Sequence, residues 1–253
     1  MGRRVSVDVL YLAQNRKAFT RITFELLLRN TNWDRVRRLV VYDDGSQDGT
    51  ADYLRQNIDR CPAEHDLIAV DYYERYNSPV GIMLDYLAGD AGEWFTKIDN
   101  DVALPEGWLD ALVDTAAVAG DAIDLLGFEA GMTERPPETG EPRYEIREAR
   151  HIGGVGLMRS GCFRAHHRPR PRGRHFGFTE WQHASDLRIG WLTPDLRSPL
   201  LDRMPTHPFV TLSDRYVGLG WQRVWPAYTP GYMEWAYGWL LEDEVMEQIE
   251  EDL

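Results

Sequence analysis

The chain has 253 residues, a formal net charge of −13, and a composition that is 43% hydrophobic and 11% aromatic. That length and apolar content are enough for one enzyme-sized globular core. The negative charge argues against wholesale wrapping of nucleic acid or adhesion to an anionic membrane, although a local basic patch can override the average field.

The sequence lacks the segments that direct a chain to or across a membrane. It has no apolar run of about 18 residues and no charged, apolar leader with a small-residue cleavage site. Its two cysteines, Cys61 and Cys162, are far apart and fit a reducing compartment. We therefore expect a cytoplasmic protein with no membrane partner.

The first half of the chain alternates short apolar strands with segments of helical periodicity. The expected strands cover residues 5–12, 39–42, 67–73 and 94–98. The expected helices cover 18–30 and 50–58, then run through Leu87 after a turn at 77–79, and from Pro105 onward. Such alternation predicts an α/β fold with a mainly parallel sheet, helices on both faces and ligands beyond the carboxyl ends of the strands.

The second half is less regular. Its expected elements are strands at 122–128 and 152–158, a Pro- and Glu-rich loop at 133–142, a basic loop at 164–175 and an acidic amphipathic helix at 242–253. The sequence has no internal repeat, and no long linker separates the two halves. We therefore expect a single domain over residues 1–253.

The segment Asp99-Asn100-Asp101 ends the expected strand at 94–98. Its two carboxylates can converge on one cation, and Mg²⁺ or Mn²⁺ needs only one or two such ligands when substrate phosphates supply the rest. The alternative is a solvated acidic turn, which is what most such triplets are.

A second polar cluster, Asp43-Asp44-Gly45-Ser46, ends the expected strand at 39–42. These residue types can satisfy the backbone of a capped turn before the helix that starts at Thr50. However, two adjacent carboxylates are more than a turn needs, and they suit the N–H and hydroxyl groups of a nucleoside.

The order and spacing of these two clusters resemble the inverting family-2 glycosyltransferases of GT-A fold. The resemblance covers roughly residues 5–185. It implies a nucleotide-sugar-binding half at about residues 1–105 and an acceptor-binding half at about 106–253. The donor that it implies is a nucleotide-diphosphate sugar, with a UDP-sugar as the first choice, and the implied cofactor is Mn²⁺ or Mg²⁺.

The resemblance also assigns roles to individual residues. Asp43 and Asp44 take the nucleoside, Asp99 lies on the ribose side, and Asp101 shares the metal with Asp99. The implied nucleotide-sugar-binding set is completed by Ala13, Asn15, Arg16 and Asn100.

A general base is expected in the Gly- and aromatic-rich segment at 175–181, and Glu180 is the candidate. The family commonly has a Glu-Asp pair there, whereas this chain has Thr179-Glu180. The alternative is that Glu180 is a surface partner of an arginine. His207 is a candidate third metal ligand, although a lone histidine usually has a simpler role.

The acceptor is open at this stage. Residues 97–101, 151–154 and 177–181 resemble small phage-encoded glycosyltransferases, some of which modify hydroxymethylated pyrimidines in DNA; the location would then be the host cytoplasm. The five arginines and three histidines of residues 164–175 could meet DNA phosphates, clamp the donor diphosphate, or balance the acidic surface. A glycan or small-molecule acceptor is the conventional alternative.

Two other functions use the same sheet and carboxylates: a nucleotidyltransferase, and a non-catalytic protein that binds sugar nucleotides. A nucleotidyltransferase normally has a Gly-rich first loop that holds a triphosphate, and residues 13–17 are not glycine-rich. The sequence therefore favours sugar transfer, with Glu180 removing the acceptor proton and the anomeric configuration inverting.

Overall fold

The computed structural model describes residues 6–104, 106–128, 146–148, 152, 155–165, 178–183, 187–192 and 210–211. The chain begins with alternating strands and helices. They are β1 (Val7–Ala13), α1 (Lys17–Asn30), β2 (Val36–Asp43), α2 (Thr50–Asn57), β3 (Glu64–Ala69), α3 (Pro79–Ala88) and β4 (Trp94–Asp99). Three short 3-10 turns lie between them, η1 (Trp33–Arg35), η2 (Ile58–Arg60) and η3 (Tyr72–Glu74).

The remaining elements follow β4. They are β5 (Val102–Ala103), α4 (Trp108–Ala119), η4 (Gly120–Ala122), β6 (Leu125–Phe128), β7 (Ile146–Glu148), β8 (Val155–Arg159), α5 (Ser160–Ala165), α6 (Phe178–His183), β9 (Ile189–Leu192) and β10 (Val210–Thr211). β5 and β10 form a small antiparallel pair.

The main sheet has the strand order β3-β2-β1-β4-β8-β6-β9-β7. β3, β2, β1 and β4 are parallel to one another, as their intervening helices require. β8 then runs antiparallel to β4, pairing Val155 with Ile98 and Arg159 with Trp94. The predicted α/β class with a mainly parallel sheet is confirmed, and β8 is the point in the strand order at which the parallel pairing ends.

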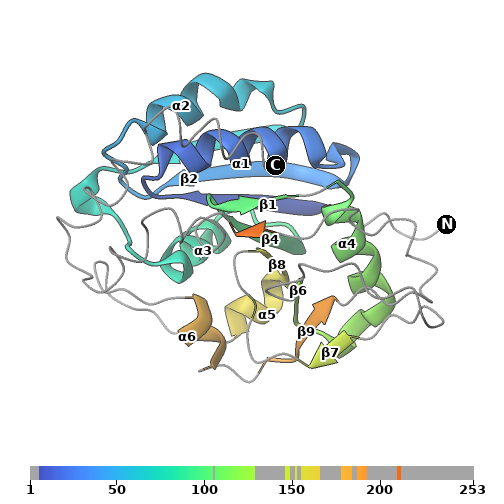
Figure 1. Ribbon diagram of the computed structural model, residues 1–253. Helices are drawn as coiled ribbons and strands as arrows, with labels where there is room; N and C mark the ends of the chain where they lie inside the picture. Colours follow the sequence, from blue (N-terminus) through green and yellow to red (C-terminus); the bar gives the residue numbers. More distant parts are fainter. Residues whose placement is uncertain are drawn as a thin grey trace.

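Helices cover both faces of this sheet (Figure 1). Alternate residues of a strand point to opposite faces, so β1 sends Val9 and Tyr11 to one side and Leu10 to the other. The first side packs against α1, α2 and α4, and the second packs against α3, α5 and α6. The central strands of the sheet are thus buried between two apolar layers.

The main difference from the sequence prediction concerns β3. We expected a strand at residues 67–73, but β3 begins at Glu64 and residues 72–74 form a 3-10 turn. β3 is an edge strand whose side chains are exposed or only half-buried, so it carries little of the apolar signal that identifies a buried strand. Pro105, the loop at 133–142 and the expected helix at 242–253 lie outside the described residues.

No helix in the described part of the chain is long and apolar enough to cross a membrane.

Candidate active site

Three strand ends meet at one edge of the sheet. β1 lies between β2 and β4, with Ala13 paired to Asp43 and Leu12 paired to Asp99. The carbonyl of Ala13 accepts a hydrogen bond from the backbone N–H of Asp44 at 2.8 Å, which continues the pairing into the loop. The two acidic clusters and the predicted first loop are therefore brought together, as the carboxyl ends of parallel strands require.

Asp43 and Asp44 are both buried but have different partners. The two carboxylate oxygens of Asp44 accept the backbone N–H groups of Tyr76 and Asn77, each at 2.7 Å, and so hold the loop before α3. Oδ1 of Asp43 accepts the N–H of Ser46 at 2.9 Å, whereas Oδ2 is buried and has no hydrogen-bond partner among the described residues. Burial raises the pKa of both carboxyl groups. Of the pair, Asp43 is the one with an oxygen left for a ligand.

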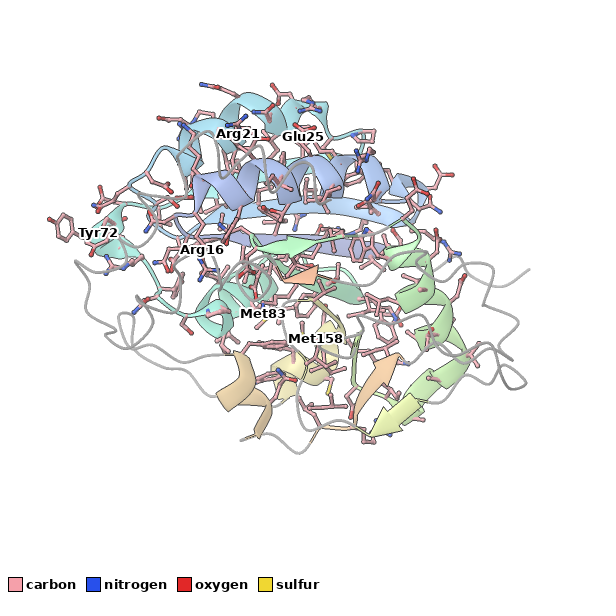
Figure 2. The ribbon with its side chains drawn as sticks, viewed as in Figure 1. Arg16, Arg21, Glu25, Tyr72, Met83 and Met158 are labelled. Atoms are coloured by element: carbon pink, nitrogen blue, oxygen red, sulfur yellow. The ribbon has the colours of Figure 1, made fainter. Side chains whose placement is uncertain are left out.

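The loop between β1 and α1 has an unusual backbone. Asn15 and Arg16 both lie in the left-handed region, at φ 53° and φ 63°, a conformation that costs a non-glycine residue roughly 1–3 kcal/mol. The loop after β2 holds it in place: Ser46 Oγ accepts the N–H of Asn15 at 2.7 Å, and Oδ1 of Asn15 accepts the N–H of Gln47 at 2.8 Å. This conformation places the Arg16 side chain at the end of the sheet near α3 (Figure 2).

Each carboxylate of the Asp-x-Asp segment is paired with a cation of the chain. Lys97 Nζ lies 2.5 Å from Oδ2 of Asp99, and Arg16 Nη1 lies 2.5 Å from Oδ2 of Asp101. Burial raises the pKa of Asp99, and the charge of Lys97 opposes that shift. Lys97 was not among the predicted site residues; its position two residues before Asp99 puts it on the same strand face, a signal that the alternation of a strand could have given.

Asn100, predicted to bind the nucleotide sugar, has its side chain turned into the protein. Its Nδ2 donates to the carbonyl of Asn15 at 2.8 Å and to Oγ1 of Thr20 at 2.9 Å. Its own carbonyl accepts from Oγ1 of Thr23 at 3.0 Å. Asn100 therefore fastens the first loop and α1 to the end of β4, and in this structure it contributes position rather than a ligand group.

The donor set fits a hard divalent cation that also binds phosphates. Asp99 and Asp101 offer carboxylate oxygens at one strand end, which is the chemistry that Mg²⁺ and Mn²⁺ select. Among the described residues no group of three or more His, Cys, Asp and Glu side chains lies close enough to hold a metal by itself. His207, the predicted third ligand, lies outside the described residues. The remaining coordination would then come from water and the substrate.

Glu180, the candidate base, lies in α6, which packs against the same face of the sheet as Lys97. The side-chain amide of Gln182 binds both backbone groups of Ile152, accepting from N at 2.7 Å and donating to O at 3.0 Å. The ring of Phe178 lies 4.9 Å from Lys97 Nζ. These contacts bring the helix that carries Glu180 next to the Asp99 strand. Residues 166–175 of the predicted basic loop lie outside the described residues.

The sequence that forms these strand ends matches a known protein family. Residues 8–169, more than half of the chain, match the model of glycosyl transferase family 2. The chain belongs to this family. The match covers nearly all of β1, and β2 and β4 with their acidic ends, so the predicted family is confirmed. No curated protein sequence is significantly similar to the chain.

Solved structures of this family's architecture confirm the GT-A fold. TarS of S. aureus (residues 1–349) is 16% identical with a TM-score of 0.52, and the match covers 74% of this chain and 58% of TarS. The mannosyltransferase PcManGT of Pyrobaculum calidifontis, solved with GDP-Man and Mn²⁺, is 16% identical with a TM-score of 0.53 over 77% of this chain and 56% of PcManGT. The chain thus spans a little over half the length of these two relatives.

The same fold also occurs in a nucleotidyltransferase. The inositol-1-phosphate CTP transferase of T. maritima is 12% identical with a TM-score of 0.51, and the match covers 81% of this chain and 94% of that protein. The fold alone therefore does not separate the two activities, and the family match of residues 8–169 is the observation that favours sugar transfer.

Proposed function

We propose that the protein is a metal-dependent, inverting glycosyltransferase that uses a nucleotide-diphosphate sugar. The observation that carries this proposal is the meeting of Asp43, Arg16 and the Asp99–Asp101 pair at one sheet edge. Asp43 offers a hydrogen-bond acceptor for the base or the ribose, and Arg16 offers a cation for the phosphates. The Asp99–Asp101 pair offers oxygen ligands for a metal, so the set matches the parts of such a donor.

The donor would lie across the ends of β2, β1 and β4. Oδ2 of Asp43 is suited to accept an N–H of the base, as it has no hydrogen-bond partner among the described residues. Uracil, thymine and guanine all carry a ring N–H of this kind, and UDP is our first choice. Asp99 would lie towards the ribose, and Asp101 with Asp99 would hold the cation, which when bound stabilises the negative charge of the departing diphosphate.

The chain's own residues would perform the remaining chemistry. Glu180 would take the proton of the acceptor hydroxyl while the hydroxyl oxygen forms a bond to the anomeric carbon. The bond from that carbon to the diphosphate oxygen breaks on the opposite side, so the configuration inverts. Arg16 would bind the phosphate charge, and the packing of α6 against Lys97 and Ile152 would hold Glu180 at a fixed distance from the donor.

The acceptor would be a glycan, a small molecule or DNA containing hydroxymethylated pyrimidines. The charge of −13 favours the first two, and the arginines and histidines of residues 164–175 favour the third. Nucleotidyl transfer is the less favoured function, because residues 13–17 do not form a Gly-rich phosphate loop.

Calorimetric titration with UDP, GDP and dTDP, each with and without Mn²⁺, tests the donor site. We expect the wild type to bind one diphosphate only when Mn²⁺ is present, and Asp101→Asn to lose that binding. Glu180→Gln should retain the binding but lose sugar transfer. Absence of binding for every diphosphate would refute the proposed function.

A further inference from the structure

The two cations that neutralise the Asp-x-Asp carboxylates differ in how they are held. The side chain of Lys97 is 2% exposed and lies against Phe178, whereas that of Arg16 is 20% exposed. Lys97 is therefore enclosed beside Asp99, although the side chain of Asp99 is itself 34% exposed and that of Asp101 only 10%. Of the two cations, Arg16 is the one that can leave its carboxylate without remaining buried.

The backbone around Arg16 is held so that the side chain keeps reaching Asp101. The N–H of Lys17 donates to Oδ2 of Asp48 at 2.9 Å, the carbonyl of Arg16 accepts the N–H of Thr20 at 2.9 Å, and Asn100 holds the carbonyl of Asn15. The strained backbone at Arg16 is thus fixed from both sides. Strain that the surroundings maintain at a site is a sign that the position of the side chain matters.

We propose that Arg16 competes with the divalent cation for Asp101, and that the donor phosphates accept Arg16 when the cation takes its place. Arg16 would then weaken metal binding in the absence of donor and strengthen donor binding in the presence of metal. This inference rests on the proposed function, and it adds a coupling between metal and nucleotide that passes through one side chain.

The geometry explains why Arg16, rather than Lys97, would yield. Moving Lys97 away from Asp99 would leave a buried ammonium beside Phe178 without its carboxylate, which is costly. Arg16 is partly exposed, and a phosphate oxygen can replace the carboxylate as its partner. The exchange therefore keeps every charge at the site paired.

Arg16→Gln removes the competing charge, and Arg21→Gln is a matched control. Arg21 is an exposed residue of α1, the helix that follows Arg16. It lies on the α2 side of α1 away from Arg16 (Figure 2), and its loss changes the net charge equally. Arg16→Gly is a second variant in which the left-handed backbone carries no strain. Thermal unfolding of all three would show that each is folded before binding is measured.

The first measurement is the affinity for Mn²⁺ without nucleotide. It is obtained from the electron paramagnetic resonance signal of the unbound ion. Both Arg16 variants should bind Mn²⁺ about fivefold more tightly than the wild type and Arg21→Gln, the change expected from about 1 kcal/mol of ion pairing. At saturating Mn²⁺ the same variants should bind the nucleoside diphosphate more weakly.

Unchanged Mn²⁺ affinity in the Arg16 variants, with normal binding of the diphosphate by the wild type, would overturn this inference and leave the proposed function intact. Mn²⁺ affinity that rises equally in Arg21→Gln would also overturn it, since the effect would then reflect net charge. If the wild type binds neither Mn²⁺ nor any diphosphate, the proposed function and this inference fail together.

Discussion

Asp43 and Asp44 are neighbours in the sequence but have separate tasks in the site. Asp44 uses both oxygens to hold the N–H groups of Tyr76 and Asn77, whereas Asp43 keeps Oδ2 without a partner among the described residues. The motif thus combines one carboxylate that holds the loop before α3 with one that has an oxygen available for the proposed ligand. Single substitutions should separate these tasks.

Asp43→Asn should weaken nucleoside diphosphate binding by roughly tenfold or more, because a hydrogen bond to a charged acceptor contributes about 1.5–3 kcal/mol. Burial raises the pKa of Asp43, so the ionised carboxylate disfavours folding at neutral pH, and the variant should not lower the free energy of unfolding. Calorimetry and urea denaturation measure the two quantities.

Asp44→Ala is the comparison for that variant. It leaves the N–H groups of Tyr76 and Asn77 without acceptors, which should lower the free energy of unfolding by about 1–3 kcal/mol. If instead both variants lost nucleotide binding and kept full stability, the division of roles between Asp43 and Asp44 would be wrong.

At the scale of elements, α6 depends on tertiary contacts for its position. It has six residues, from Phe178 to His183, and so short a helix is not stable by itself in water. The ring of Trp181 packs at a tilt of 32° against Phe163 with ring centroids 4.4 Å apart, and Gln182 binds the backbone of Ile152. The position of Glu180 therefore depends on the docking of the whole helix.

Gln182→Ala should loosen the attachment of α6 to the sheet, because the backbone N–H and C=O of Ile152 both lose their partner. We expect the turnover number to fall roughly 10–100-fold, since small displacements of a catalytic group have large effects, with no change in nucleotide affinity. Steady-state kinetics beside calorimetry checks this. Gln56→Ala, at an exposed position of α2, is the control, and a loss of nucleotide affinity in Gln182→Ala would contradict the assignment.

At the scale of the whole molecule, the two ends of the parallel strands differ: the carboxyl ends carry the candidate site, and the amino ends carry a buried polar cluster. This cluster is centred on Asp8, which is fully buried at the start of β1. Its carboxylate accepts from Arg37 Nε at 2.7 Å, from the N–H of Gly92 at 2.9 Å and from the hydroxyl of Tyr86. Asp8 thus ties β2 and the end of α3 to the beginning of β4, far from the polar site.

Asp8→Ala should lower the free energy of unfolding by about 1–3 kcal/mol, because the buried hydroxyl of Tyr86 and the N–H of Gly92 lose their acceptor. The nucleotide affinity of the folded protein should not change. Asp90→Ala is the control: Asp90 also binds Arg37, but its side chain is 85% exposed, so its loss should cost less than about 1 kcal/mol. Equal costs for both variants would argue against the Asp8 cluster.

The fold of the first half was predictable because its buried strands and amphipathic helices carry strong periodic signals. The end of β4 at Asp99 and the cap of α3 at Ser78 agree with the expected strand and turn. The antiparallel direction of β8 was not predictable, because strand direction depends on the connections rather than on local residue patterns.

The juxtaposition of the candidate site residues was predictable, but their contacts were not. Strand ends placed Asp43, Asp99 and Asp101 together, whereas the inward turn of Asn100 and the separate role of Asp44 depend on loops far away in the sequence. The left-handed backbone at Arg16 has no local signal, since arginine does not favour that conformation. The buried cluster at Asp8 depends in the same way on residues that only the tertiary fold brings together.

The reversal at β8 also affects how the enzyme could change during evolution. The chain enters β8 at the edge where β4 leaves, so Val155 lies beside Ile98. Insertions before β8 would enlarge the surface beside the end of β4 without changing the pairing of β1 with β2 and β4. Under the proposed function, loops grafted at this place would change the acceptor while the strands that would hold the donor retain their register.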